Sequence, residues 1–530
     1  MVPAIDGARA ASEAHRWGDA WRHWSTFAPE GLDVDDLDRA ATAAYLTGHD
    51  EEGFARWMRA HQVCLADDAL HRAAHFGGKL AQGYGFKGDL GRCRGWVDRT
   101  ARLLDEAHID CVEQGYLEHG LGMLRILEAG DVAGAHAHFV HAGKIGARFA
   151  HRDLITVARI GEGRTLIYLG DIADGVALLD EAMVAIEASE LSPLAAGDAY
   201  CSVIDACSEL FDLERCRAWT DSFVRWCDTQ QELVLYRGHC FLHRAEVLEW
   251  LGAWPEALVQ ARHACDRLAA PVNPAALGGA FAVEGDLLRL VNDFRAAEAA
   301  YVRASEYGHD PQPGLALLRF AQGEIEAAAA MIRRALDEAG DPISRARHLG
   351  AFVEVMLATG DTSAARDAVD ELRQVAATLG SSLLRAHAAR AAGAVLKAEG
   401  DPKNALVELR RAFSGFQALG VRYDAARARV LIAETCATLG DFEAASMESA
   451  AARAVLDLLM PTPTSLEGLT QRELEILRLL ASGKTNRGIS QSLVISEKTV
   501  ASHVSHIFTK IGVTSRSAAT AYAYDHGLLG

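Results

Sequence analysis

Apolar residues recur along most of the chain at the three- and four-residue spacing of one helix face. The stretches ALLDEAMVAIEA (177–188) and AEAAYVRASEYG (297–308) are examples. Aromatic residues make up only 7% of the sequence, and the unbranched residues that dominate it lose little rotamer freedom in a helix. The pattern therefore predicts an all-α protein.

A short turn interrupts this helical pattern roughly every forty residues. Its glycine suits the left-handed conformation that ends a helix, and the aspartate that often follows can cap the next helix. These turns are centred on Gly18, Gly48, Gly88, Gly130, Gly170, Gly252, Gly323, Gly360, Gly400 and Gly440, with Asp212 and Asn292 in the same frame. The repeating unit is thus a helix, a tight turn and a helix.

Small side chains recur five residues after the turn, where the two helices of a pair must approach closely. They are Cys93, Ala135, Gly175, Ala257, Ala297, Ala328, Ala365, Ala405 and Ala445. Such pairs cannot bury their apolar faces alone, so we expect them to stack into a solenoid.

The G-D-x-x-x-A turn resembles the tetratricopeptide repeat, although the period here is longer. This resemblance predicts a repeat array over residues 1–457, whose concave surface would hold a peptide, protein or small-molecule effector. PTPTS (461–465) breaks the last helix and predicts a linker at 458–466. The loops at 270–275 and 309–314 fit insertions between repeats, and a hinge near 310 is the alternative.

Charge divides the chain in the same place. The net charge is −19, but Ser465–Gly530 carries +2, which leaves −21 on the rest. An acidic body repels polyanions, whereas the tail can contact one. The ten cysteines form no CxxC pair, and neither a signal peptide nor an apolar run of membrane-spanning length is present. We therefore expect a cytoplasmic protein without membrane contact.

The GKT sequence at 483–485 raises the question of a nucleotide-binding loop. A Walker motif would need glycine at 478 and a preceding strand, but Arg478 stands there within a helical pattern. His136, His138 and His141 do not share one helix face, and no GxSxG or HExxH motif stands out. We expect no enzyme activity, no cofactor and no metal site.

Helix signals explain this region better. Thr470 and Glu473 form a capping box that starts a helix near Gln471, and Gly483 ends that helix. Thr485 caps a second helix and Ser496 a third. In the third helix, Val500, Val504, Ile507 and Ile511 face the core, which leaves a stripe of Lys498, Ala501, Ser502, Ser505 and Thr509 outside. This is the geometry of a helix-turn-helix.

Residues 467–530 resemble the small four-helix DNA-binding domain of LuxR-type transcription regulators. Matching positions include Leu469, Thr470, Glu473, Leu477, Leu480, Gly483, Asn486, Ile489, Leu493, Ser496, Thr499, Val500, His503, Ile507, Lys510, Gly512, Val513, Ser515 and Arg516. The resemblance implies that the third helix reads the major groove of double-stranded DNA. It also implies that the fourth helix, about Arg516 to His526, contributes to a homodimer or higher homo-oligomer.

Candidate DNA-binding residues follow from this placement. They are Lys484, Thr485, Asn486, Arg487, Ser496, Lys498, Thr499, Ala501, Ser502, His503, Ser505, His506, Lys510 and Arg516. Ala501 and Ser505 replace residues that are often basic or polar in the family, and Gly488 replaces a usual glutamate. We therefore expect modest affinity per monomer and a dependence on assembly. A solvated face of a protein-binding bundle is the alternative interpretation of the stripe.

Together these features predict a bacterial transcription regulator whose solenoid senses an effector or partner. We expect neither an ATPase module nor a phosphoacceptor receiver domain, since the repeat frame already includes the first residues. Two other hypotheses remain open. In one the chain is a repeat scaffold whose C-terminal domain serves dimerisation, and in the other the acidic body masks the DNA-binding tail.

Overall fold

The computed structural model describes residues 2–188, 190–270, 273–459, 469, 471–493, 496–513 and 515–525. The chain forms two compact units, Met1–Val455 and Leu456–Gly530. Regular structure in the described ranges is helical apart from an isolated bridge between Arg16 and Gln231. The all-α prediction is confirmed.

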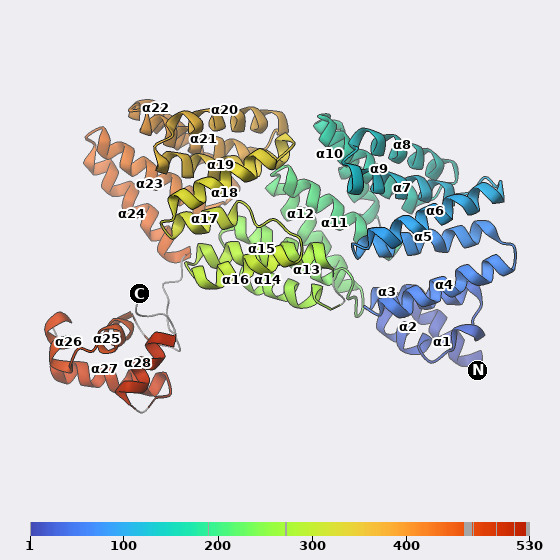
Figure 1. Cartoon of the computed structure of the whole chain (residues 1–530), viewed down its shortest axis with the longest axis horizontal. Helices are drawn as coiled ribbons and strands as arrows, with labels where there is room; N and C mark the ends of the chain where they lie inside the picture. The colour runs from blue at the N-terminus through green and yellow to red at the C-terminus, as the bar shows by residue number, and fades with distance from the viewer. Residues whose placement is uncertain are drawn as a thin grey trace. The chain divides into compact units, whose positions relative to one another are not determined.

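The first unit is a succession of antiparallel helix pairs (Figure 1). Its helices are α1 (Val2–Glu13), α2 (Trp17–Trp24), η1 (Pro29–Gly31), α3 (Val34–Leu46), α4 (Asp50–Ala66), α5 (Leu70–Phe86), α6 (Leu90–Ala107), α7 (Glu113–Ala129), α8 (Val132–Arg148), α9 (Arg152–Leu169), α10 (Ile172–Glu187), α11 (Pro193–Glu209), α12 (Leu213–Thr229), α13 (Arg237–Leu251), α14 (Trp254–Leu268), α15 (Pro274–Leu290), α16 (Phe294–Glu306), α17 (Gly314–Ala321), α18 (Ile325–Glu338), α19 (Pro342–Thr359), α20 (Thr362–Leu379), α21 (Ser382–Ala398), α22 (Pro402–Leu419), α23 (Arg422–Thr438) and α24 (Phe442–Leu459). The predicted tetratricopeptide-like solenoid is confirmed.

The glycine backbone is left-handed at every predicted glycine turn except Gly18. A side chain caps the next helix after most of these turns, but not after Gly48, Gly170, Gly252 or Gly323. At Gly360 the backbone is left-handed (φ 83°), and the Asp361 carboxylate accepts a hydrogen bond from the Ala364 amide at 3.1 Å. Without glycine, Asn292 adopts the same conformation, as its place in the frame predicted. In the other turn Phe211 adopts it, one residue before the predicted Asp212, which instead caps α12 by accepting a hydrogen bond from the Arg215 amide at 3.1 Å. The prediction at Gly18 is wrong, because this residue lies inside α2 and not in a turn.

Close helix approach explains the small residues that follow the turns. A Cβ added at Gly175 would lie 2.6 Å from the carbonyl oxygen of Gly163, so α9 and α10 touch through their backbones. Ala135, Ala257, Ala297, Ala328, Ala365 and Ala405 are fully buried. Larger side chains at these positions would separate the pairs and forfeit close packing.

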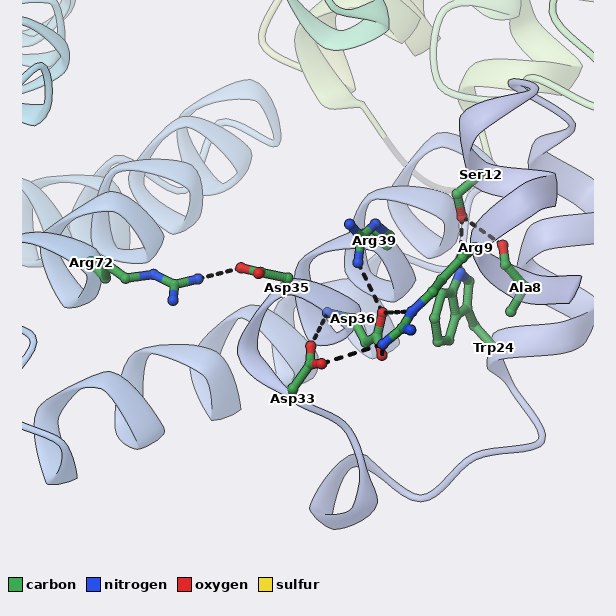
Figure 2. A network of polar contacts seen from close by, with 9 residues as sticks. All are labelled: Ala8, Arg9, Ser12, Trp24, Asp33, Asp35, Asp36, Arg39 and Arg72. Atoms are coloured by element: carbon green, nitrogen blue, oxygen red, sulfur yellow. Dashed lines mark hydrogen bonds and ion pairs between the residues drawn. The ribbon is translucent and has the colours of Figure 1, made fainter. Parts of the chain in front are cut away.

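An ion-pair network around the buried carboxylate of Asp36 joins the first helices (Figure 2). Arg9 donates to both carboxylate oxygens of Asp36 at 2.8 and 2.5 Å, and Arg39 donates to the same group at 2.9 Å. Burial raises the pKa of Asp36, but the two guanidinium groups outweigh it and hold that pKa below its usual range. The Trp24 indole donates to the Ser12 hydroxyl at 2.9 Å beside this network. Together these bonds tie α1 to α2 and α3.

The solenoid also contacts itself between repeats that are distant in sequence. Between α12 and α13, the amides of Val234 and Leu235 donate to the carbonyl of Leu46 at 2.9 and 3.3 Å. Further along the chain, the Ser381 hydroxyl donates to the carbonyl of Phe211 at 2.8 Å. These contacts connect repeats that a simple linear array would keep apart.

Across the described ranges, no helix is both long and apolar enough to cross a bilayer. All ten cysteines are free thiols with buried side chains. The histidines considered for a metal site have protein partners: His138 and His141 both contact the Glu118 carboxylate, at 2.6 and 3.2 Å, and His136 contacts the Thr165 hydroxyl at 2.9 Å. Within the described residues, no group of three or more His, Cys, Asp or Glu side chains is arranged to hold a metal ion.

Candidate nucleic-acid interface

The second unit is a small helical domain with its own core. Its helices are α25 (Gln471–Ala481), α26 (Asn486–Leu493), α27 (Glu497–Lys510) and α28 (Arg516–Asp525). The buried core residues are Leu469, Leu474, Ile476, Leu477, Leu480, Ala481, Ile489, Val500, Ile507, Ile511, Ala519 and Ala523. The predicted four-helix fold is confirmed in the described residues.

The GKT sequence is the end of one helix and the cap of the next. Gly483 takes a left-handed conformation (φ 85°) after α25, and the Thr485 hydroxyl accepts a hydrogen bond from the Gly488 amide at 3.2 Å. This geometry agrees with the capping role predicted for Thr485. Thr470, the expected partner of Glu473 in the capping box, lies outside the described residues, as does the His526 end of the fourth helix.

Helix α27 presents the predicted stripe to solvent. Ser496 caps the helix by accepting from the Thr499 amide at 3.0 Å, while Val500 and Ile507 are fully buried on the inner side. The outer positions Lys498, Ala501, Ser502, Ser505 and Thr509 are all exposed. Because four of these five side chains are small, a second surface can approach the helix closely.

Other candidate residues surround this stripe. Thr499 and His506 are exposed and His503 is half-buried on α27. On α26, Arg487 is exposed and lies 4.0 Å from the Glu497 carboxylate. The exposed Lys484 ammonium donates to the Ser492 hydroxyl at 2.9 Å.

Three further candidate side chains, Asn486, Lys510 and Arg516, join different helices of the domain or its turns to one another. Arg516 donates to the Asn486 side chain at 3.3 Å and to the Lys484 carbonyl, and so secures the turn between α25 and α26. Lys510 donates to the Glu473 carboxylate at 2.7 Å, which joins α27 to α25. Asn486, Lys510 and Arg516 therefore hold the helices in place, whatever else they contact.

The sequence pattern did not reveal two of these supports. Glu473 is buried, with 5% of its side chain exposed, and pairs with Lys510 in addition to its position in the expected capping box. Arg472 donates to the Leu493 carbonyl at 2.9 Å and pairs with Glu475 at 2.7 Å. Arg472 thereby anchors the end of α26 to the start of α25. Local patterns carry no signal for such contacts between helices.

Comparison with known proteins identifies the second unit. Residues 467–523 match the family model described as bacterial regulatory proteins, luxR family. Over 63 residues the chain is 48% identical to the transcriptional regulatory protein LiaR of Bacillus subtilis and 46% identical to the response regulator protein VraR of Staphylococcus aureus. Each match covers 12% of this chain and 30% of the relative.

Solved structures resemble the chain more loosely. One is the APC/C hetero-tetramer Cut9-Hcn1, with a TM-score of 0.37 and 12% identity over 86% of this chain and 94% of that one. Another is BtubC from P. vanneervenii, with a TM-score of 0.29 and 20% identity over 42% of this chain and 96% of that one.

The capped helices, the buried core and the family match agree on one assignment. Residues 467–523 form a LuxR-family helix-turn-helix domain, which follows a helical-repeat solenoid in the sequence.

Proposed function

We propose that the protein is a transcriptional regulator that binds double-stranded DNA through α27. The observation that carries this proposal is the exposed stripe of Lys498, Ala501, Ser502 and Ser505 on a capped helix of a LuxR-family domain. An α-helix fits the major groove, and small side chains bring its backbone close to the base edges. Lys498 supplies the one strong charge on the stripe.

The residues around the stripe divide into two roles. Ser496, Thr499, His503, Ser505 and His506 lie on or beside the helix that enters the groove. Lys484, Thr485 and Arg487 lie at the start of α26, where exposed cations and helix N-terminal amides favour a backbone phosphate.

The cations with internal partners lie at the edge of the proposed interface. The Lys510 ammonium keeps donors beyond its bond to Glu473 and is exposed. Arg516 and Asn486 hold the turn that presents Lys484. We propose that all three position the phosphate-binding groups, with Lys510 also contacting the DNA backbone.

We propose that the protein binds DNA as a homodimer or higher homo-oligomer. Two copies of α27 would contact the two halves of a symmetric site, and this would raise the DNA affinity of a weakly charged recognition helix. We further propose that an effector or partner bound to the solenoid controls DNA binding, without catalysis by either unit.

Selection from a random-duplex library at two salt concentrations tests the DNA-binding proposal. Full-length protein and residues 461–530 are compared with their Lys498→Ala variants. Lys403→Ala in the full chain is a matched control, because Lys403 is an exposed second residue of α22 just as Lys498 is the second residue of α27. The proposal predicts enrichment of a two-fold symmetric site that salt and Lys498→Ala weaken and Lys403→Ala does not. Absence of enrichment with both wild-type proteins contradicts it.

The weak charge of the stripe favours one alternative, a scaffold that uses the C-terminal domain for dimerisation. A truncated protein of residues 1–460, which lacks the C-terminal domain, distinguishes the scaffold from the DNA-binding regulator. Full biological effect of this fragment in a deletion strain would establish the scaffold, whereas loss of the effect supports the DNA-binding regulator.

A further inference from the structure

A partly open cavity of about 740 Å³ lies in the first unit, where the N-terminal repeats meet α13 and α14. Trp21 of α2 and Thr47 after α3 form one side, and Leu233, Phe241 and Arg267 form the other. The cavity is therefore built by segments about 200 residues apart. Its volume falls within the range of small-molecule sites, about 300–1,000 Å³.

Specific bonds hold the two sides together. The Val234 and Leu235 amides donate to the Leu46 carbonyl, and Arg22 donates to both carboxylate oxygens of Glu232 at 2.9 and 3.0 Å. The Trp17 indole donates to Gln230 at 3.1 Å next to them. The cavity is thus a defined feature of the fold and not a gap between loosely packed repeats.

The charges that line the cavity are unbalanced. Arg22 is neutralised by Glu232 and by Asp19, to which it donates at 2.7 Å. Arg237 donates to Asp228 and to the Cys227 carbonyl, each at 2.8 Å. Arg267, in the last turn of α14, is exposed and has no hydrogen-bond or ion-pair partner among the described residues. Arg267 is therefore the arginine of the lining that no described carboxylate neutralises.

The same cavity has an apolar wall. Trp21 is half-buried, with the Arg56 guanidinium 4.8 Å from its ring centroid and the His49 ring 4.8 Å away. These neighbours fix the indole in place. Leu233 is buried and Phe241 half-buried on the opposite side. Flat apolar groups bind between such surfaces, while the arginine selects their charge.

We propose that this cavity binds a small organic anion that joins a carboxylate to a flat apolar or aromatic group. Arg267 pairs with the carboxylate, and Trp21, Leu233 and Phe241 cover the apolar part. Because the ligand touches α2, α13 and α14 at once, it tightens the contact between the first repeats and the middle of the solenoid. The inference names the effector class of the proposed regulator and rests on that function only for its effect on DNA binding.

Calorimetric titration of the full-length protein with 2-naphthoate tests the site directly, with 2-naphthamide as the neutral counterpart. We expect one naphthoate per chain, bound about tenfold more tightly than the amide. Phe241→Leu should weaken both compounds by a similar factor. Absence of naphthoate binding at millimolar concentration, or equal affinity for the two compounds, overturns the proposal.

Two arginine variants test whether Arg267 binds the carboxylate of the ligand. Arg267→Gln should reduce naphthoate affinity about tenfold and leave naphthamide affinity unchanged. Arg295→Gln is the control, because Arg295 is an exposed helix arginine without a partner among the described residues and lies outside the lining of the cavity. Undiminished naphthoate binding by Arg267→Gln overturns the assignment.

DNA affinity measured with and without 2-naphthoate distinguishes two claims: that the cavity binds the anion, and that the bound anion controls DNA binding. A changed DNA affinity in wild type, absent in Arg267→Gln, supports the effector role. Naphthoate binding with an unchanged DNA affinity overturns that role and leaves the site established. Naphthoate binding by a chain that selects no DNA sequence refutes the proposed function, not the site.

Discussion

Lys498 differs from every other candidate cation of the second unit in being exposed on the outer stripe of α27 without an ion-pair partner among the described residues. One phosphate contact contributes about 0.9 to the slope of log affinity against log salt concentration. We expect Lys498→Ala to weaken binding to the selected duplex about three- to thirtyfold. The slope should fall by about one if Lys498 contacts a phosphate, and should not change if it contacts a base.

Titration of duplex at several salt concentrations measures both quantities, with Lys403→Ala as the control. An affinity that Lys498→Ala leaves unchanged would show that this side chain is not part of the interface. The effect can be assigned to Lys498 itself, because its side chain has no hydrogen bond or ion pair with any other described residue.

Glu473 has a structural role that its position in the sequence only partly predicts. Its carboxylate is buried and bonded to Lys510, so truncation leaves the lysine without its partner and removes a contact between α25 and α27. We expect Glu473→Ala to lower the free energy of unfolding of residues 461–530 by about 1–3 kcal/mol.

Glu475→Ala is the matched control. Glu475 lies two positions after Glu473 on the same helix and pairs with Arg472, but half of its side chain is exposed, so the loss should stay within about 0.5 kcal/mol. Urea denaturation of both variants provides the comparison. Equal losses would mean that burial of the Glu473–Lys510 pair has no energetic consequence.

At the scale of elements, the sequence predicts those features that depend on neighbouring residues. Gly360 with Asp361, and Thr485 and Ser496 as caps, follow from neighbouring residues alone. The turn predicted at Gly18 is absent, and this glycine instead lies within α2 against the Glu232 side chain, more than 200 residues further along the chain. A distant partner of this kind leaves no mark on the local pattern.

Asp198 shows how such distant partners join elements. It lies on α11 and accepts hydrogen bonds from Tyr236 at 2.8 Å and from Gln82 of α5 at 2.5 Å. Burial raises its pKa to about 6, and the two donors oppose this rise only in part. The folded protein therefore binds this proton more tightly than the unfolded chain does.

A pH-dependent stability follows from that shift. The carboxyl favours folding below its unfolded pKa of about 4, and this contribution is lost as pH rises through about 6. Asp198→Asn stays neutral and keeps an acceptor for Tyr236. Between pH 4.5 and 7.5 we expect the variant to gain roughly 1–2 kcal/mol relative to wild type, since partial exposure of the carboxyl reduces the full effect. Thermal unfolding at both pH values measures the gain, and a difference that is the same at both contradicts it.

At the scale of the whole molecule, the repeat period predicts a solenoid but not where it meets itself. Each helix pair is rotated slightly relative to the one before, and these rotations accumulate over many repeats. Contacts such as Ser381 with Phe211 or Trp254 with Tyr423 therefore depend on the total rotation between distant repeats. The cavity between Trp21 and Arg267 has the same origin. The sequence therefore predicted the helical repeats, the C-terminal helix-turn-helix and the exposed face of α27, but not this candidate effector site.

The division of charge between the units favours tighter DNA binding by the C-terminal domain alone than by the full chain. An acidic body of net charge −21 repels DNA, and it attracts the +2 tail that carries the LuxR-family domain. We expect residues 461–530 to bind the selected duplex more tightly than the full chain at low salt. The difference should shrink as salt rises, because screening acts on both the repulsion and the masking. Titration of one duplex with the two proteins at matched salt measures it. Equal affinities at every salt concentration would exclude masking by charge, and the proposed control of DNA binding would then rest on a bound effector or on assembly.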